Sequence, residues 1–215
     1  METLRRYGRL YKVFVAQFFK YLVQSKADFL IGLFGFFFTQ ATGIAFLFLV
    51  FQQIPNLADW TLPQLIFIYG FAQIPRGLDH LFTDNIWMVA WHLVVNGKFD
   101  RYMLRPMNLF LQVIFEKLQP DALGELLVGA ILISVSFAKG IVILDIPHIV
   151  LFFVSVAAGA VIYTAIKLLF ASLAFWMKVS GPVLYTAYQL ADFAKYPSEI
   201  YLSLIHISEP TRPRL

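Results

Sequence analysis

Polar side chains interrupt an otherwise apolar stretch in the first half of the sequence. Five of them fall at positions i, i+3, i+4, i+7 and i+8: Arg76, Asp79, His80, Thr83 and Asp84. These spacings place them on one face of a helix. If that helix crosses a membrane from Gln64, Arg76 lies about 18 Å and Asp84 about 30 Å along it. An unpaired charge at such depth costs roughly 2.5–3.5 kcal/mol, so we expect Arg76 to pair with Asp79.

Two interpretations of this polar stripe remain open. The stripe could line a substrate path or form a gate, or it could be a structural ion pair between packed helices. Two other charges fall within apolar segments. We expect Lys167 to extend to the head groups at the inner border, and Glu125 to meet the positive end of its own helix.

The sequence contains no site for nucleotide hydrolysis. A phosphate-binding loop needs glycines at fixed spacing before a Gly-Lys-Ser/Thr sequence. The one Gly-Lys pair, Gly97-Lys98, is followed by Phe99 and has no glycine at the required position before it. We therefore expect this chain to have no ATPase activity and to hold no cofactor.

Metal and hydrolase chemistry are also unsupported. The chain has four histidines, none paired at metal-ligand spacing on one helix turn, and no cysteine. No Gly-x-Ser-x-Gly elbow is present. An enzyme acting on lipid-linked substrates would have only Asp79, His80 and Asp84 as candidate catalytic groups, and we keep it as an alternative function.

Composition predicts that helices embedded in a membrane position these residues. Of the 215 residues, 60% are hydrophobic and 14% are charged, and the mean hydropathy is +0.72. Soluble domains carry roughly 25% charged residues, so a bilayer is the natural solvent for this chain. The apolar runs are continuous rather than alternating, which favours helices over a barrel. The net charge of +4 reflects basic inner loops rather than nucleic-acid binding.

The pattern predicts an all-α polytopic membrane protein with about five transmembrane helices. We expect spans at about residues 29–51, from 64 toward 97, at 122–143 and at 149–176, and a shorter one from 181 to about 193. Basic residues then place Gly97–Lys117 inside, and Gln52–Pro63 and Asp145–His148 outside. A basic amphipathic segment, residues 1–28, is predicted to lie on the inner leaflet, with the N-terminus cytoplasmic.

The last residues differ from the rest. Residues 203–213, Ser-Leu-Ile-His-Ile-Ser-Glu-Pro-Thr-Arg-Pro, resemble a translated sequencing adapter. We interpret residues 202–215 as a non-native, disordered tail and the chain as truncated before a sixth span. The predicted organisation is therefore an interface helix over 1–28, a transmembrane domain over 29–201, and this tail.

A stripe of small residues marks the first span. Gly35, Thr39 and Gly43 are four residues apart, a spacing that allows close helix contact. The stripe could form the seam of a homodimer or pack within one subunit, and both alternatives stay open.

Two segments carry a resemblance to a known family. The loop Asn96-Gly97-Lys98-Phe99-Asp100-Arg101-Tyr102-Met103-Leu104-Arg105-Pro106 resembles the region of type-2 ABC permeases where a short cytoplasmic helix meets the ATPase. The stretch from Gln73 to Trp87 is the most specific part, and it resembles the ABC-2 family transporter proteins, first catalogued as a domain of unknown function. Residues 6–9 and 119–125 fit the same branch. The resemblance covers residues 1 to about 201.

The resemblance implies a six-span half of a dimeric exporter in the bacterial inner membrane. The partners it implies are an ABC ATPase that binds ATP, and a second permease subunit, identical or different, within membrane lipid. It places the ATPase-coupling loop at Gly97, Phe99, Asp100, Leu104, Arg105 and Pro106, and it does not fix a substrate. An ATP-independent channel or scaffold is the remaining alternative, in which this segment is an ordinary inner loop.

Overall fold

The computed structural model describes residues 26–53, 60–140 and 145–195, and the isolated positions 13, 15, 16, 20 and 197. Every element within these residues is a helix, which confirms the all-α prediction. The predicted tail 202–215 and most of the predicted interface helix 1–28 lie outside the described residues. The first long helix begins at Lys26, so residues 26–28 belong to it rather than to a separate interface helix.

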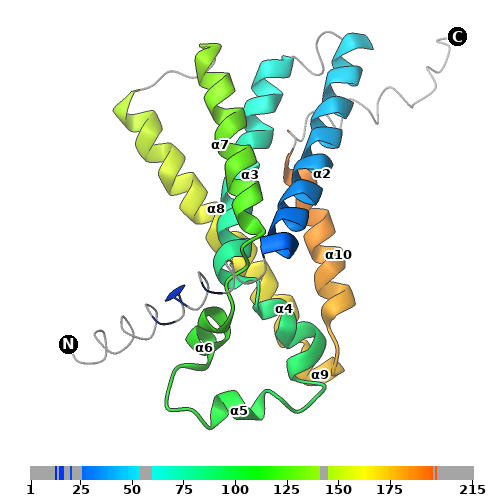
Figure 1. Ribbon diagram of the computed structural model, residues 1–215, viewed down its shortest axis with the longest axis vertical. Coiled ribbons are helices and arrows are strands. Elements are labelled where there is room, and N and C mark those ends of the chain that lie inside the picture. Colours follow the sequence, from blue (N-terminus) through cyan, green and yellow to red (C-terminus); the bar gives the residue numbers. More distant parts are fainter. Residues whose placement is uncertain are drawn as a thin grey trace, which may run out of the picture.

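Five longer helices make up the body of the fold. They are α2 (Lys26–Gln53), α3 (Leu62–Thr83), α7 (Ala122–Ala138), α8 (Ile146–Ser172) and α10 (Gly181–Ala191). Figure 1 shows that α2, α7 and α10 run opposite to α3 and α8. The chain thus reverses direction at each connection, as successive passes through a bilayer require.

Within the residues that the structure describes, two helical stretches are long and apolar enough to cross a membrane. They are Phe29–Gln52 and Ile146–Met177, and α7 is a shorter apolar helix. Helix α3 carries the polar stripe, and α10 has only 11 residues. Length and composition therefore establish two candidate spans, while the expected total of five belongs to the proposal below.

The surface of the long helices is apolar, as expected in a bilayer. Large hydrophobic side chains are exposed all along α2 and α8, among them Ile31, Phe34, Phe38, Phe153, Val161 and Leu169. A monomeric soluble protein rarely exposes so continuous an apolar surface. Hydrocarbon chains can cover these side chains without the free-energy cost that water would impose.

Helix α3 lies at the centre and contacts α2, α7 and α8. Thr61 precedes its first residue, and the Thr61 backbone N–H donates to Gln64 Oε1 at 2.9 Å. This bond satisfies one of the amide groups left free at a helix start. Pro63 fits in the first turn, where no amide donor is needed.

Glycines bring α3 unusually close to two neighbours. A Cβ on Gly129 of α7 would lie 2.9 Å from the carbonyl oxygen of Gly70, and one on Gly159 of α8 would lie 2.8 Å from Pro75 Cβ. Small residues at helix crossings permit such contact. Helices α7 and α8 are therefore held against α3 on either side of the polar stripe.

Short helices gather at one end of the molecule (Figure 1). They are α4 (Ile86–Met88), the π-helix η1 (Val89–Leu93), α5 (Asp100–Met103), α6 (Leu109–Glu116) and α9 (Ala174–Met177). Gly97 adopts a positive φ of 64° in the turn before α5, a conformation that glycine reaches without strain. The Asn108 side chain accepts from the N–H of Phe110 at 3.0 Å and so caps α6.

Three predicted boundaries differ from the observed ones. Helix α8 begins at Ile146, because Pro147 fits its first turn instead of forming part of an outer loop. Helix α7 ends at Ala138, and Gly140 follows with a φ of 68°. Residues 141–144, the end of the predicted third span, lie outside the described residues. Finally, 3-10 helix η2 (Asp192–Lys195) extends α10.

Candidate functional site

The centre of the candidate site is a fully buried ion pair between α3 and α8. Lys167 Nζ lies 2.8 Å from Asp79 Oδ2, and both side chains have no exposed surface. Lys167 Nζ also donates to Thr83 Oγ1 at 3.4 Å and lies 3.6 Å from Asp84 Oδ1. Such a pair persists only when further hydrogen bonds satisfy the buried atoms.

The oxygens of Asp79 have those additional partners. Thr83 Oγ1 donates to Asp79 Oδ1 at 2.6 Å, and Thr164 Oγ1 donates to the same oxygen at 2.9 Å. The Tyr188 hydroxyl of α10 donates to Oδ2. Lys167 Nζ also lies 5.5 Å from the centre of the Tyr188 ring, within reach of a cation–π contact. Asp79 therefore joins three helices.

A second group of charges joins α3 to α7 and η2. His80 Nδ1 lies 2.8 Å from Oε1 of the buried Glu125. Arg76 Nε lies 3.8 Å from the same oxygen, and Arg76 Nη1 binds Asp192 Oδ1. Lys195 Nζ completes the group at 3.4 Å from Asp192 Oδ1.

The ring of Tyr188 connects the two groups. It stacks on His80, with ring centres 5.7 Å apart and planes at 17°. The Arg76 guanidinium carbon lies 6.0 Å from the same ring centre. We call the residues of both groups the polar cluster: Arg76, Asp79, His80, Thr83, Asp84, Glu125, Thr164, Lys167, Tyr188, Asp192 and Lys195. Its charged members come from α3, α7, α8 and η2, so a shift of any one of these helices alters its contacts.

The charges in the cluster nearly balance. Four carboxylates face Arg76, Lys167 and Lys195 among the described residues. Protonation of His80 would add the fourth positive charge. Within a membrane such balance limits the cost of burial.

Two predictions are wrong, one about a pairing and one about the position of a side chain. Arg76 does not pair with Asp79, because Arg76 turns toward Glu125 and Asp192 while Asp79 faces Lys167. Residues three apart on a helix differ in direction by about 60°, enough to meet different neighbours. Lys167 does not extend to the head groups either, since its side chain is completely buried against α3.

The remaining stripe residues, His80, Thr83 and Asp84, share the cluster with Asp79. The first-turn position of Glu125 is observed, but its nearest charged groups are side chains of α3. Sequence reasoning missed Tyr188, Thr164, Asp192 and Lys195. Tyrosine and threonine are common in apolar helices, so no sequence signal separates Tyr188 and Thr164 from packing residues.

The alternative function, an enzyme acting on lipid-linked substrates, would need an accessible carboxylate, and Asp79 does not provide one. This residue is 1% exposed, and its oxygens are occupied by Lys167, Thr83, Thr164 and Tyr188. A general acid or base must reach the proton it transfers. No group of three or more potential metal-ligating side chains occurs in the described part of the chain.

The predicted coupling loop lies on the group of short helices. Leu104 is 85% exposed, and Asp100, Arg105 and Pro106 are exposed as well. Phe99 is half-buried and makes an edge contact with Phe175, at 4.9 Å between ring centres. The loop thus presents polar groups and two large apolar side chains, Met103 and Leu104, outward. It is packed against the other short helices.

Hydrogen bonds of α6 side chains hold this group of short helices together. Gln112 Nε2 donates to the carbonyl oxygens of Tyr102 at 3.2 Å and Met107 at 2.9 Å. The Tyr102 hydroxyl donates to Glu116. Partial burial raises the pKa of Glu116, and the nearby charge of Arg101 opposes that rise. The exposed residues of the predicted coupling loop are therefore attached to the packed group of short helices.

The small-residue stripe of α2 makes little contact within the subunit. A Cβ on Gly35 would meet nothing within 4 Å, and Thr39 is exposed. Gly43 does approach α3, where a Cβ would lie 2.9 Å from the Tyr69 hydroxyl. Other close glycine contacts lie between α3 and its neighbours α7 and α8. A seam between subunits at Gly35 and Thr39 stays a prediction.

Comparison with known proteins gives one match. A family model described as ABC-2 family transporter protein matches residues 37–208. The match begins within α2 and ends inside the segment interpreted as a tail, seven residues beyond the range expected from the resemblance. No curated protein and no solved structure matches the chain.

Proposed function

Since this chain belongs to the ABC-2 family of transporter proteins and is a permease component of an ABC transporter, we propose that it is the exporter subunit of a bacterial plasma-membrane complex. It pairs with a second permease subunit and is driven by a separate ABC ATPase, which binds the ATP. The proposed subunit crosses the membrane five times in the sequence at hand, with a cytoplasmic N-terminus.

The direction of the helices supports this arrangement. The five longer helices alternate in direction (Figure 1), and the short helices gather at one end. Lys98, Arg101 and Arg105 lie at that end, which the positive-inside rule assigns to the cytoplasm. A cytoplasmic ATPase would meet the protein there.

One observation carries the proposed coupling to an ATPase. One packed core contains both Tyr102 of the coupling loop and Tyr188 of the polar cluster. The other buried residues of this core are Ile86, Val89, Ala90, Leu93, Val113, Ala171 and Leu184. The Ser180 N–H before α10 also donates to the carbonyl oxygen of Ala90 in η1 at 3.0 Å. Densely packed side chains transmit displacement.

The polar cluster is then the element that responds to the ATPase. A push on α5 reaches α10 through this core, and α10 holds Tyr188 against Asp79 and His80. Rearranged ion pairs between four helical elements give two discrete packings, as alternating access requires. In this proposal the cluster closes the pathway when its charges are paired.

The experiment places a charge on an exposed apolar residue of the coupling loop. We expect Leu104→Asp to reduce co-purification of the permease with its ABC ATPase, and to abolish permease-stimulated ATP hydrolysis in proteoliposomes. Insertion should not change, because Leu104 is 85% exposed and packs against little.

The matched control is Ile146→Asp, at a residue that is 79% exposed at the opposite end of the molecule. This variant should bind the ATPase normally. Equal ATPase binding by both variants and the unmodified protein would show that another surface receives the ATPase.

A further inference from the structure

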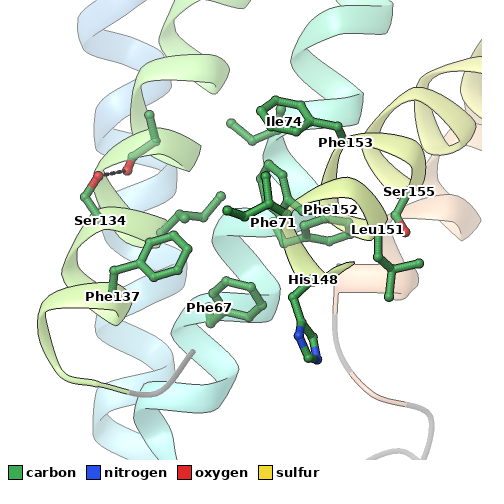
Figure 2. Close-up of a pocket in the computed structure, with 13 residues that line it drawn as sticks. Phe67, Phe71, Ile74, Ser134, Phe137, His148, Leu151, Phe152, Phe153 and Ser155 are labelled. Atoms are coloured by element: carbon green, nitrogen blue, oxygen red, sulfur yellow. Dashed lines mark hydrogen bonds between the residues drawn. The ribbon is translucent and has the colours of Figure 1, made fainter. Parts of the chain in front are cut away.

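An apolar pocket lies between α3, α7 and α8, at the end opposite the short helices. Its volume is about 730 Å³, within the range of small-molecule and cofactor sites, roughly 300–1,000 Å³. Figure 2 shows Phe67, Phe71 and Ile74 on one wall and Phe152 and Phe153 on another. Ser134 Oγ donates to its own helix at 2.7 Å, so this hydroxyl does not require a polar ligand.

The pocket results from the divergence of α7 and α8. These two helices follow one another in the chain and both contact α3, but they separate toward the end that carries their connection (Figure 1). The aromatic rings of Phe67, Phe71 and Phe152 line the space between them. The pocket is open on one side, because its lining residues Leu151 and Phe153 are 61% and 65% exposed.

The walls determine the chemistry of that occupant. An apolar cavity gives water no hydrogen-bond partners, whereas a hydrocarbon chain gains from every methylene group that it places there. Helix α8, which forms one wall, belongs to a stretch long and apolar enough to cross a bilayer. The medium next to α8 is therefore formed by the acyl chains of membrane lipids.

The end of the pocket is polar on the side of α8. His148 lies at this end, in the first turn of α8 (Figure 2), and binds Asp145 through Nδ1. Hydrogen bonds from His148 lower the pKa of Asp145. Lys139, at the C-cap of α7, is exposed two residues after the lining residue Phe137. Polar and charged groups at one end of an apolar pocket match the two parts of a lipid.

We propose that this pocket binds one acyl chain of a membrane phospholipid, with the head group at the end marked by Lys139 and His148. The chain lies between α7 and α8 and keeps them apart. This inference rests on the membrane-spanning arrangement proposed above but not on ATPase coupling.

The test uses a phospholipid with a photoreactive diazirine near the end of one acyl chain, in vesicles that contain the whole protein. Cross-links should form on Phe71 and Ile133, which line the pocket; Ile133 is only 7% exposed and out of reach of surrounding lipid. Ser134→Trp fills the pocket and should reduce these cross-links about tenfold, the loss expected when two methylene groups no longer fit.

Ile131→Trp is the matched control. It is three residues away on α7, 52% exposed, and does not line the pocket. This variant should keep the pocket cross-links. Cross-links confined to exposed positions such as Phe34 and Val161, or an unchanged yield at Ile133 in Ser134→Trp, would overturn the lipid site and leave the spanning arrangement intact. Absence of cross-links at Phe34 and Val161 too would overturn both.

Discussion

At the scale of single residues, the structure assigns partners that spacing could not identify. Asp79 and Lys167 lie about 26 Å and about 32 Å from the starts of α3 and α8. These two helices run in the same direction, so both residues reach a similar depth. Depth can be counted along the sequence, but the side of the helix that meets a neighbour cannot. Lys167 therefore faces Asp79 rather than lipid.

Breaking this pair should be far more harmful than removing it. Lys167→Met alone leaves Asp79 charged and buried, a change that costs about 3–5 kcal/mol of folding stability. Asp79→Asn with Lys167→Met removes both charges, and the amide can still bind Tyr188 and Thr164. We expect the double variant to recover at least half of that loss, measured by thermal unfolding in detergent.

Arg76 provides the comparison for this experiment. Its partners are Glu125 and Asp192, so Arg76→Ala and Asp79→Ala should show a much smaller coupling free energy than Lys167 with Asp79. Strong recovery in the Arg76 and Asp79 double variant would favour the pairing first expected from the sequence.

At the scale of the helices, glycines decide how closely the elements pack. Gly70 and Gly77 on α3 face α7, and Gly129 on α7 faces Gly70. Gly77 sits three residues before His80 and packs against Glu125 Cβ. This close crossing brings the His80 and Glu125 side chains within hydrogen-bonding distance.

Gly129→Ala should destabilise the protein by about 1–3 kcal/mol, because the added methyl group meets the backbone of α3 as well as a side chain. Its Cβ would lie 2.6 Å from Ile74 Cδ1 and 2.9 Å from Gly70 O. Gly35→Ala, whose Cβ meets nothing within 4 Å, should leave the thermal midpoint of the isolated subunit unchanged. Equal midpoints for both variants would contradict the close crossing.

At the scale of the whole molecule, the alternating helices predict two opposite faces. The chain contains no cysteine, so single cysteines can report the side of the membrane. We expect Lys98→Cys to react with an impermeant thiol reagent only from the cytoplasmic side. Ile146→Cys, 79% exposed at the start of α8, should react only from outside. Reaction of both from one side would contradict the proposed topology.

The apolar composition, the uninterrupted helical segments and the polar stripe were readable from the sequence alone, because each depends on neighbours within a few residues. The family resemblance also came from local segments, and the match over residues 37–208 confirms it. The observed helix ends differ from the predicted ones by a few residues where a proline or glycine lies nearby, as at Ile146 and near Gly140.

Only the tertiary structure decided which charges meet and where space remains. The partners Asp79 and Lys167 are 88 residues apart in the sequence, and the pocket arises from the angle between α7 and α8. Hydrophobic burial has no direction of its own, so an apolar helix does not specify which face meets which neighbour. Close glycine contacts and buried hydrogen bonds select that orientation, and they form only once the helices are packed.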